Sequence, residues 1–174
     1  MKQIQLKIST PSEPIRPGRG FYQLEEDALF VQISMFTERK HFFNYLENEK
    51  LQFDLDREGN LIFIEVDHPR RHWESDEKLK APARAEAAEI KWLHFREELP
   101  EAVFLTNQNK SILKLEFSKS KSPLFYYLAD SVIAETDKNN HLTAIWVTEI
   151  SDDFAGKEIA EFRQEHRIAK SYFL

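Results

Sequence analysis

The chain has 174 residues, 41% of them hydrophobic, which suits one domain or two small ones with an apolar core. Its net charge of −6 argues against a general nucleic-acid or membrane-surface binder, because contacts to phosphates need clustered Lys and Arg. The sequence has no Cys, which excludes disulfides, zinc–thiolate sites and thiol catalysis.

The first part of the chain predicts strands and loops. Residues 1–8 alternate apolar and polar side chains and hold no long apolar run, so they are neither a signal peptide nor a membrane span, and we expect a cytoplasmic protein. Residues 10–20 hold three Pro and two Gly and predict a loop. Residues 28–35 are apolar at alternate positions, as in a strand. Residues 36–50 allow a short helix or a strand, and the repeat described below favours the strand.

Residues 51–66, LQFDLDREGNLIFIEV, predict a β-hairpin. Asp56 suits the start of its turn, and Gly59 suits a position with positive φ. A calcium-binding EF-hand loop is the alternative, because acidic residues and a Gly fall at its expected positions: Asp54, Asp56, Glu58, Gly59 and Glu65. An EF-hand needs helices on both sides, whereas these flanks alternate as strands do, so we favour the hairpin.

Two helices are predicted. Between residues 82 and 99, apolar residues recur at steps of three and four, as on one face of a helix: Ala85, Ala88, Trp92, Phe95 and Leu99. Pro82 suits the first turn of this helix, and Pro100 ends it. A second helix is expected at about residues 153–167, with N-cap candidates Ser151, Asp152 and Asp153.

The strands of the second half repeat the pattern of the first half. Residues 22–47 align with residues 104–129 at an offset of 82 without a gap, and after one deletion the offset is 81. Matched pairs include Tyr22 with Phe104, Val31 with Leu113, Phe43 with Phe125, and Gly59 with Asn140. Asn is the next best residue after Gly at a positive φ. The pattern predicts two copies of one β-unit, whose aromatic faces share a core.

The expected fold is α+β, a single domain over residues 1–174 with two pseudo-repeated antiparallel β-meander units. Its expected parts are the first β-unit (1–67), a loop and connecting helix (68–100), the second β-unit (101–150) and a C-terminal helix (151–174).

A motif runs through residues 21–66 in the order Tyr-x-x-Glu-x-Asp-x-Leu, Asp-x-Asp-x-x-Gly and Ile-Glu. It is carried by Tyr22, Glu25, Asp27, Leu29, Asp54, Asp56, Gly59, Ile64 and Glu65. In this motif the chain resembles a family of short, β-rich bacterial domains of unknown function. The second copy departs from it, with Asn107 and Asn109 for the acids and Trp146 for the Glu. The resemblance implies an antiparallel β architecture and no known activity.

Residues 67–76 hold the densest group of reactive side chains. His68 and His72 are four residues apart, a spacing that lets two imidazoles bind one metal from a helix. Pro69 and the polarity of the segment favour a solvated loop instead. The metal candidates are Asp67, His68 and His72, with His94 or His141 as a third imidazole.

A binding surface is the other candidate. Arg70 and Arg71 could grip a carboxylate or a phosphate. The candidate surface residues are Trp73, Arg70, Arg71, Tyr22, Glu25 and Asp27. The leading hypothesis is a non-catalytic binding or interaction protein for an unknown protein or small ligand, with no cofactor, nucleic acid or membrane. The alternative is a metal-dependent or acid–base enzyme that uses Asp67, His68 and His72, and a homodimer stays open as an assembly.

Overall fold

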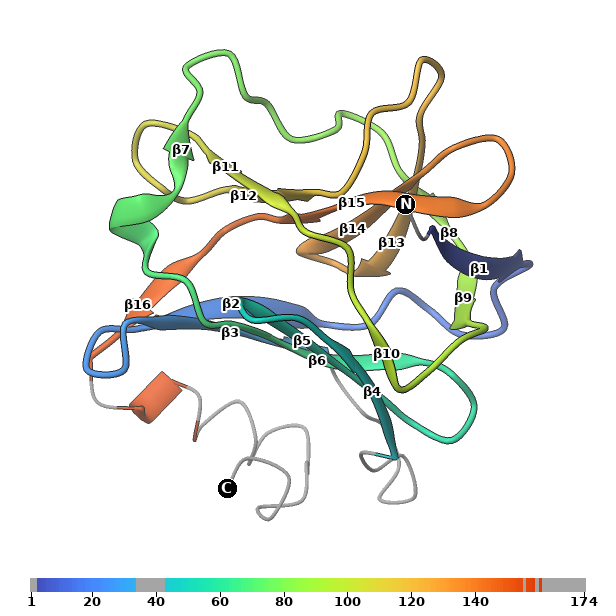
Figure 1. The fold of residues 1–174 in the computed structure, drawn as a ribbon, viewed down its shortest axis with the longest axis horizontal. Coiled ribbons are helices and arrows are strands. Elements are labelled where there is room, and N and C mark those ends of the chain that lie inside the picture. The colour runs from blue at the N-terminus through green and yellow to red at the C-terminus, as the bar shows by residue number, and fades with distance from the viewer. Residues whose placement is uncertain (1–2, 34–42, 155, 159, 161–174) are drawn as a thin grey trace.

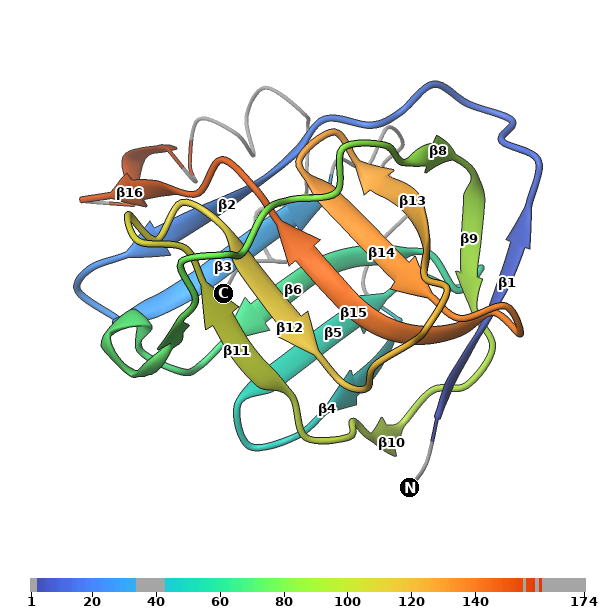
Figure 2. The ribbon, with the colours of Figure 1, turned by 90° about the horizontal axis from the view of Figure 1, so that it is seen from above.

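The computed structural model describes residues 3–33, 43–154, 156–158 and 160. Two β-sheets face each other across one hydrophobic core (Figure 1). Seen from above, the strands of one sheet cross those of the other (Figure 2). The protein is therefore a two-layer β-structure.

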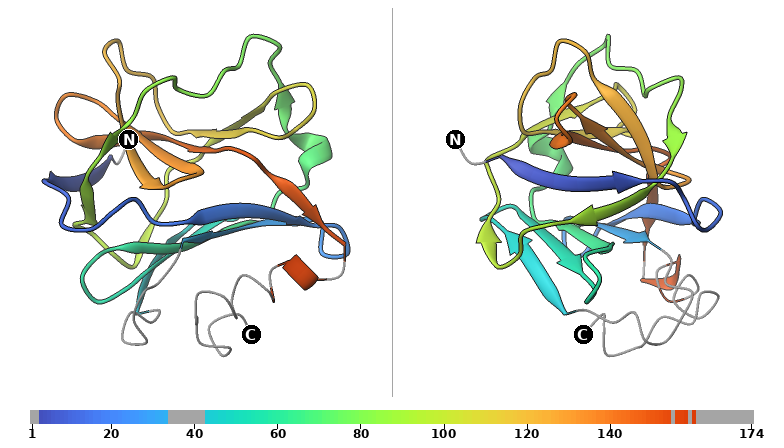
Figure 3. Two further views of the ribbon diagram at one scale, coloured as in Figure 1. Left: turned by 180° about the vertical axis from the view of Figure 1, so that it is seen from behind. Right: turned by 90° about the vertical axis from the view of Figure 1, so that its right-hand side faces the viewer.

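The first sheet has the spatial order β10 (Glu97–Glu98), β4 (Asn44–Glu47), β5 (Leu51–Leu55), β6 (Leu61–Val66), β3 (Ala28–Ile33), β2 (Gly18–Gln23) and β16 (Ser151–Asp153). The second sheet has the order β7 (Glu74–Ser75), β11 (Val103–Thr106), β12 (Leu113–Glu116), β15 (His141–Val147), β14 (Val132–Thr136), β13 (Leu124–Ala129) and β8 (Glu86–Ala87). At the side, β1 (Ile4–Ser9) pairs with both β15 and β9 (Glu89–Trp92) (Figure 3). A short 3-10 turn, η1 (Arg70–His72), follows β6.

The predicted α+β class is wrong. No helix among the described residues reaches seven residues. The segment expected to form the connecting helix instead contains β8, β9 and β10. Ile90 and Trp92 are buried, whereas Glu89 and Lys91, which alternate with them, are less buried, and this period of two is that of a strand. Pairing with β1 outweighs the helix propensity of this Ala- and Glu-rich segment, because propensity is a weak preference.

The predicted C-terminal helix is also not observed as such. Its N-cap candidates form β16, a strand that pairs in parallel with β2. Of the residues that follow, Lys157, Glu158 and Ala160 are helical, and residues 161–174 lie outside the described part of the chain. The expected strand at residues 36–50 is seen as β4, and residues 34–42 also lie outside the described part.

The two halves of the chain repeat one strand order, in agreement with the predicted repeat. The first sheet contains the run β4-β5-β6-β3-β2, and the second contains β13-β14-β15-β12-β11. The predicted register needs a correction, however. Val31 pairs with Ile64, whereas Leu115 pairs with Ile145, so Val31 corresponds to Leu115 and not to Leu113. A shift of two residues keeps every side chain on the same face of the sheet. The apolar alternation of the two copies therefore still matched in the predicted alignment.

The segment that follows each copy adds a short edge strand to the sheet of the other copy. The strand that follows the first copy, β7, pairs in parallel with β11 of the second copy. The strand that follows the second copy, β16, pairs in parallel with β2 of the first copy. The link between the copies adds β8 beside β13 and β10 beside β4. Each sheet thus ends at both sides in a strand of two or three residues, which limits the exposed edge that another chain could extend.

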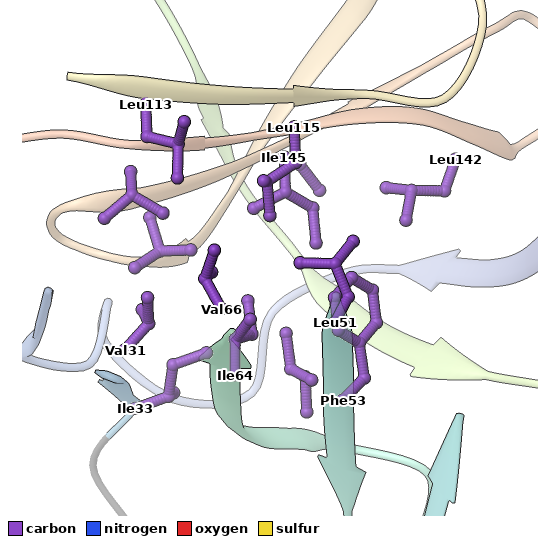
Figure 4. Packing of buried hydrophobic residues seen from close by; sticks show 14 of the residues in the cluster. Val31, Ile33, Leu51, Phe53, Ile64, Val66, Leu113, Leu115, Leu142 and Ile145 are labelled. Carbon is purple, nitrogen blue, oxygen red and sulfur yellow. The ribbon is translucent and has the colours of Figure 1, made fainter. Parts of the chain in front are cut away.

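The core lies between the inner faces of the two sheets (Figure 4). It is mostly aliphatic, with Val31, Ile64, Leu113 and Ile145 fully buried, and the expected aromatic core is confined to a few side chains. Phe53 contacts Trp92 and Phe117 edge to face, with ring centroids 6.3 and 6.1 Å apart. Other aromatic residues, such as Phe30 and Phe63, stack on each other outside this core cluster.

The hairpin turn occurs twice with the same hydrogen bonds. The Asp56 carboxylate accepts bonds from the backbone N–H groups of Glu58 and Asn60, both at 2.9 Å. The Asp137 carboxylate does the same for Asn139 and His141, at 2.8 and 2.9 Å. Gly59 has a φ of 87° and Asn140 a φ of 64°, as the sequence predicted. The flanks are strands, so this segment is a hairpin and not an EF-hand.

Candidate functional site

Loops of both copies meet at one end of the molecule, which we call the loop end (Figure 1). It comprises residues 24–27, 67–73, 107–112 and 148–154. Lys110 Nζ of the second copy donates to the carbonyl of Arg70, in the segment that follows the first copy, at 3.1 Å. Within the second copy, Ile150 N–H donates to the Ser111 carbonyl at 3.0 Å. Five of the six residues predicted as a binding surface lie in these loops, and the sixth, Tyr22, lies on the strand β2 that precedes one of them.

Tyr22 is at the centre of the loop end. Its side chain is buried at 1% exposure, and its hydroxyl donates a hydrogen bond to Asp27. The Arg70 backbone N–H donates to the same hydroxyl at 3.0 Å. Burial, together with the hydrogen bond to the Asp27 carboxylate, raises the pKa of Tyr22 above its usual value. Tyr22 therefore stays a neutral donor that holds the two loops together.

Asp27 connects this buried hydroxyl to the surface. One carboxylate oxygen accepts from Tyr22, and the other pairs with the Arg71 guanidinium. The hydrogen bonds from Tyr22 and then from Arg71 lower the pKa of Asp27. Asp27 is therefore ionised near neutral pH. Its carboxylate holds the Arg71 side chain in place, although that side chain is 65% exposed to solvent.

Arg70 ties the first copy to the end of the second. Its guanidinium lies over the Tyr22 ring, 4.4 Å from the centroid. It also donates two bonds to the Asp152 carboxylate, at 2.5 and 3.4 Å. The sequence analysis offered Arg70 as a group that could grip a carboxylate or phosphate, but in the structure the Asp152 carboxylate of the chain itself takes up its guanidinium.

Trp73 supports the loop end from below. Its indole N–H donates to the His68 carbonyl at 2.9 Å, and its ring meets the Tyr22 ring edge to face at 5.9 Å. With 5% exposure, Trp73 is buried. Tyr22 and Trp73 therefore position the surface but do not form it.

The exposed part of the loop end is apolar and acidic. Phe154 is 70% exposed and Leu24 is 37% exposed. The parallel pairing of Asp153 with Gln23 places these two residues at the ends of neighbouring strands. Glu25 and Glu26 beside Leu24 are exposed as well. Sequence reasoning missed Phe154 because it assigned the residue to a helix.

The two histidines of the metal hypothesis lie in the same loop. The ring centroids of His68 and His72 are 5.8 Å apart, and the His68 ring packs on Phe104 at 4.5 Å. Burial, and to a lesser degree the charge of Lys50, lowers the pKa of His68. His141 is engaged with Asp137 at 3.0 Å in its own hairpin turn.

A third metal ligand is not found. Among the described residues, no group of three or more His, Asp or Glu side chains could hold a metal ion. Asp67, His68 and His72 thus stay a prediction that the geometry does not support.

A cavity of about 180 Å³ lies away from the loop end, between residues 11–16, residues 87–91 and the Gly59 turn. The Lys91 ammonium in its wall already contacts Asn60 Oδ1 at 2.9 Å, Glu89 at 3.2 Å and Glu58 at 3.5 Å. These acceptors already engage the Lys91 ammonium, so it is not a free cation for a ligand in the cavity. We therefore take the loop end as the candidate site.

No protein-family model matches the chain, and no curated protein matches it either. The resemblance of residues 21–66 to a β-rich bacterial domain family accordingly stays a prediction. Within the described residues, no helix is long and apolar enough to cross a membrane.

Proposed function

We propose that this is a non-catalytic binding protein whose loop end docks onto a partner protein. The observation that carries the proposal is the exposure of Phe154 and Leu24, which lie in the same two loops as Asp152 and Asp27, the partners of Arg70 and Arg71. Aromatic residues and Arg are the residue types most enriched at energetically important positions of protein interfaces. Isolated apolar residues are normal on a surface, but here two of them adjoin an ordered ionic network.

The network supports binding because it is already rigid. Arg71 is held by Asp27, Asp27 by Tyr22, and Tyr22 by the Arg70 backbone. A side chain that is fixed before binding loses less conformational entropy when a partner arrives. The loop end therefore resembles a preformed interface more than a mobile loop.

The expected partner presents a basic surface with an apolar centre. Glu25, Glu26 and Asp67 are exposed around the apolar residues, and the chain carries a net charge of −6. Charges of opposite sign on the partner would favour encounter and orientation. The partner is expected to be a protein, because the cavity that could hold a small ligand lies elsewhere.

The test is quantitative co-purification with the full chain as bait. We would compare the wild type with Phe154→Ser and with Val103→Ser, a matched control at an exposed apolar residue on β11. Both substitutions are at exposed sites, so both variants should keep the thermal midpoint of the wild type. Loss of a central aromatic anchor typically weakens binding by about 30-fold.

The expected result is a basic protein that is retained by the wild type and by the Val103→Ser variant and lost with the Phe154→Ser variant. The proposal is wrong if all three baits retain the same proteins in the same amounts. It is also wrong if the protein lost with the Phe154→Ser variant is lost equally with the control.

A further inference from the structure

The cavity of about 180 Å³ lies along the edge of β9. Its walls include six successive residues, 11–16, on one side and five successive residues, 87–91, on the other. Side chains of a strand alternate between its two faces, so a cavity that contacts five residues in a row lies beside the backbone and not over one face. The backbone of β9 is therefore part of the cavity wall.

The edge of β9 that faces away from β1 directs backbone groups into this cavity. The Leu93 N–H donates to the Gln5 carbonyl of β1 at 3.3 Å, whereas the Trp92 N–H donates away from β1, to the Gly59 carbonyl at 2.8 Å. In an antiparallel strand the backbone groups of successive residues point to opposite edges, so those of Ile90 point the same way as those of Trp92. Because Ile90 lines the cavity, its N–H and C=O face it.

These Ile90 groups lie in a gap of the hydrogen-bonded edge. On either side of the gap the chain is paired, Trp92 with Gly59 and Ala87 of β8 with Tyr127 of β13. In the described part of the chain, Ile90 has a strand partner only in β1, and no backbone bond to it is found on the cavity side. Ile90 is 6% exposed, and buried backbone groups nearly always have partners. The edge can therefore accept one further hydrogen-bonded residue pair.

The charges around the cavity favour a basic ligand. Three carboxylates and two cations line it: Glu13, Glu58, Glu89, Arg16 and Lys91. Arg16 is paired with Glu13 at 3.5 Å, and Lys91 contacts Glu89 at 3.2 Å and Glu58 at 3.5 Å. Glu13 and Glu58 are 48% and 65% exposed, so their carboxylates have lone pairs left for another cation. With one carboxylate in excess, the wall attracts a Lys or Arg and repels an acidic residue.

The pleat of β9 determines where a basic side chain belongs on the ligand. The Ile90 side chain points into the core, so a residue directly opposite Ile90 would point the same way and should be small. The next residue of the ligand shares the other face with Glu89 and Lys91. A basic side chain beside the central small residue therefore reaches the Glu89 carboxylate.

We propose that this cavity is a docking site for an extended peptide segment of another protein, with a small residue opposite Ile90 and a Lys or Arg next to it. The small residue exchanges two backbone hydrogen bonds with Ile90, as a neighbouring strand would. The basic group lies among the three carboxylates, and its aliphatic stem packs on Ile15, which is 43% exposed in the cavity wall. The site is separate from the loop end and does not depend on the function proposed for it.

The direct test is an NMR titration of the isotope-labelled full chain with the peptide acetyl-Lys-Ala-Lys-amide. This peptide presents a Lys next to its central Ala in either strand direction. We expect a saturable shift of the Ile90 amide signal and slower exchange of its proton with solvent. The charge-reversed peptide acetyl-Glu-Ala-Glu-amide should bind about tenfold more weakly. The absence of a saturable shift at residues 87–91, or equal affinity for the two peptides, would overturn the proposal.

A pair of double variants shows whether the carboxylates of the cavity are responsible. Glu13→Gln with Glu58→Gln should weaken binding of the Lys peptide about fivefold. The matched control, Glu77→Gln with Glu101→Gln, changes two exposed carboxylates that do not line the cavity and should bind like the wild type. The Phe154→Ser variant should also bind the peptide like the wild type, which separates this proposal from that for the loop end. Equal affinity of the two double variants would contradict the docking site.

Discussion

At the scale of single residues, Asp27 is the group whose ionisation matters most for the loop end. Tyr22 and Arg71 both donate to its carboxylate, and these bonds hold its pKa below the ordinary value of 3.8. A carboxyl whose pKa is lowered by folding contributes stability above its unfolded pKa, and this contribution is lost as pH falls through the folded pKa. The stabilisation from Asp27 should therefore be complete at pH 7 and absent in strong acid.

The Asp27→Asn variant tests this dependence. Asn keeps the size of the side chain and an acceptor for Tyr22, but it loses the charge. We expect the variant to unfold at lower urea concentration than the wild type at pH 7, with a difference that shrinks as the pH falls below about 3.9. A difference that stays constant from pH 7 into strong acid would show that Asp27 contributes through shape and not through charge.

What the sequence reveals at this scale depends on how local the chemistry is. The roles of Asp56, Gly59 and Asn140 were predictable because a turn is decided by residues within five positions of each other. The bond between Arg71 and Asp27 spans 44 positions, and the bond between Arg70 and Tyr22 spans 48. The sequence predicted all four of these residues to lie at the candidate surface, but no local pattern could pair them.

At the scale of elements, β16 and the η1 turn form the joint between the copies. The Arg70 and Asp152 side chains that connect them are 29% and 33% exposed, and their two hydrogen bonds fix the geometry. We expect a double-mutant cycle of Arg70→Ala and Asp152→Ala to give a coupling energy of about 1 kcal/mol.

A matched control for this pair is Arg16 with Glu13. These two side chains lie three positions apart, at 3.5 Å, and Glu13 is 48% exposed. Their coupling should be below about 0.5 kcal/mol, because a single contact at 3.5 Å to a carboxylate that is 48% exposed is weakened by solvent, even though Arg16 is only 17% exposed. Equal coupling in both cycles, measured by urea unfolding, would show that Arg70 and Asp152 are no more than a surface pair.

Elements were predictable where local pattern and tertiary pairing agree. The 51–66 hairpin was found because its alternation matches its burial. The helix predicted at residues 82–99 failed because its apolar residues fit two periods. Ala85, Ala88 and Trp92 suit a helix, whereas Ile90 and Trp92 suit a strand, and only the pairing of β9 with β1 decides between them. Asp152 was predicted as an N-cap because Asp is common at that position, and only the pairing of β16 with β2 shows that it lies in a strand.

At the scale of the whole molecule, the repeat explains why the loops of the candidate site lie at one end. Two copies of one strand order face each other, and each lends a short edge strand to the other. Since β7 and β16 cross between the sheets, the loops that precede them are brought together at the loop end. The spacing of the sequence predicted the repeated strand order. It did not predict that each copy adds an edge strand to the other sheet, because strands of two or three residues are too short to show a period.

The central claim is that neither half is complete without the other, and a cut between the halves tests it most directly. Lys80, in the link between β7 and β8, is exposed, so a protease site inserted after it should leave the fold intact. After cleavage, we predict that residues 1–80 and 81–174 elute together at the size of the uncut chain and unfold in one transition. Each fragment alone should be unfolded, and mixing the two should restore the β-type circular dichroism signal. Two fragments that separate in native buffer and remain folded would contradict the account.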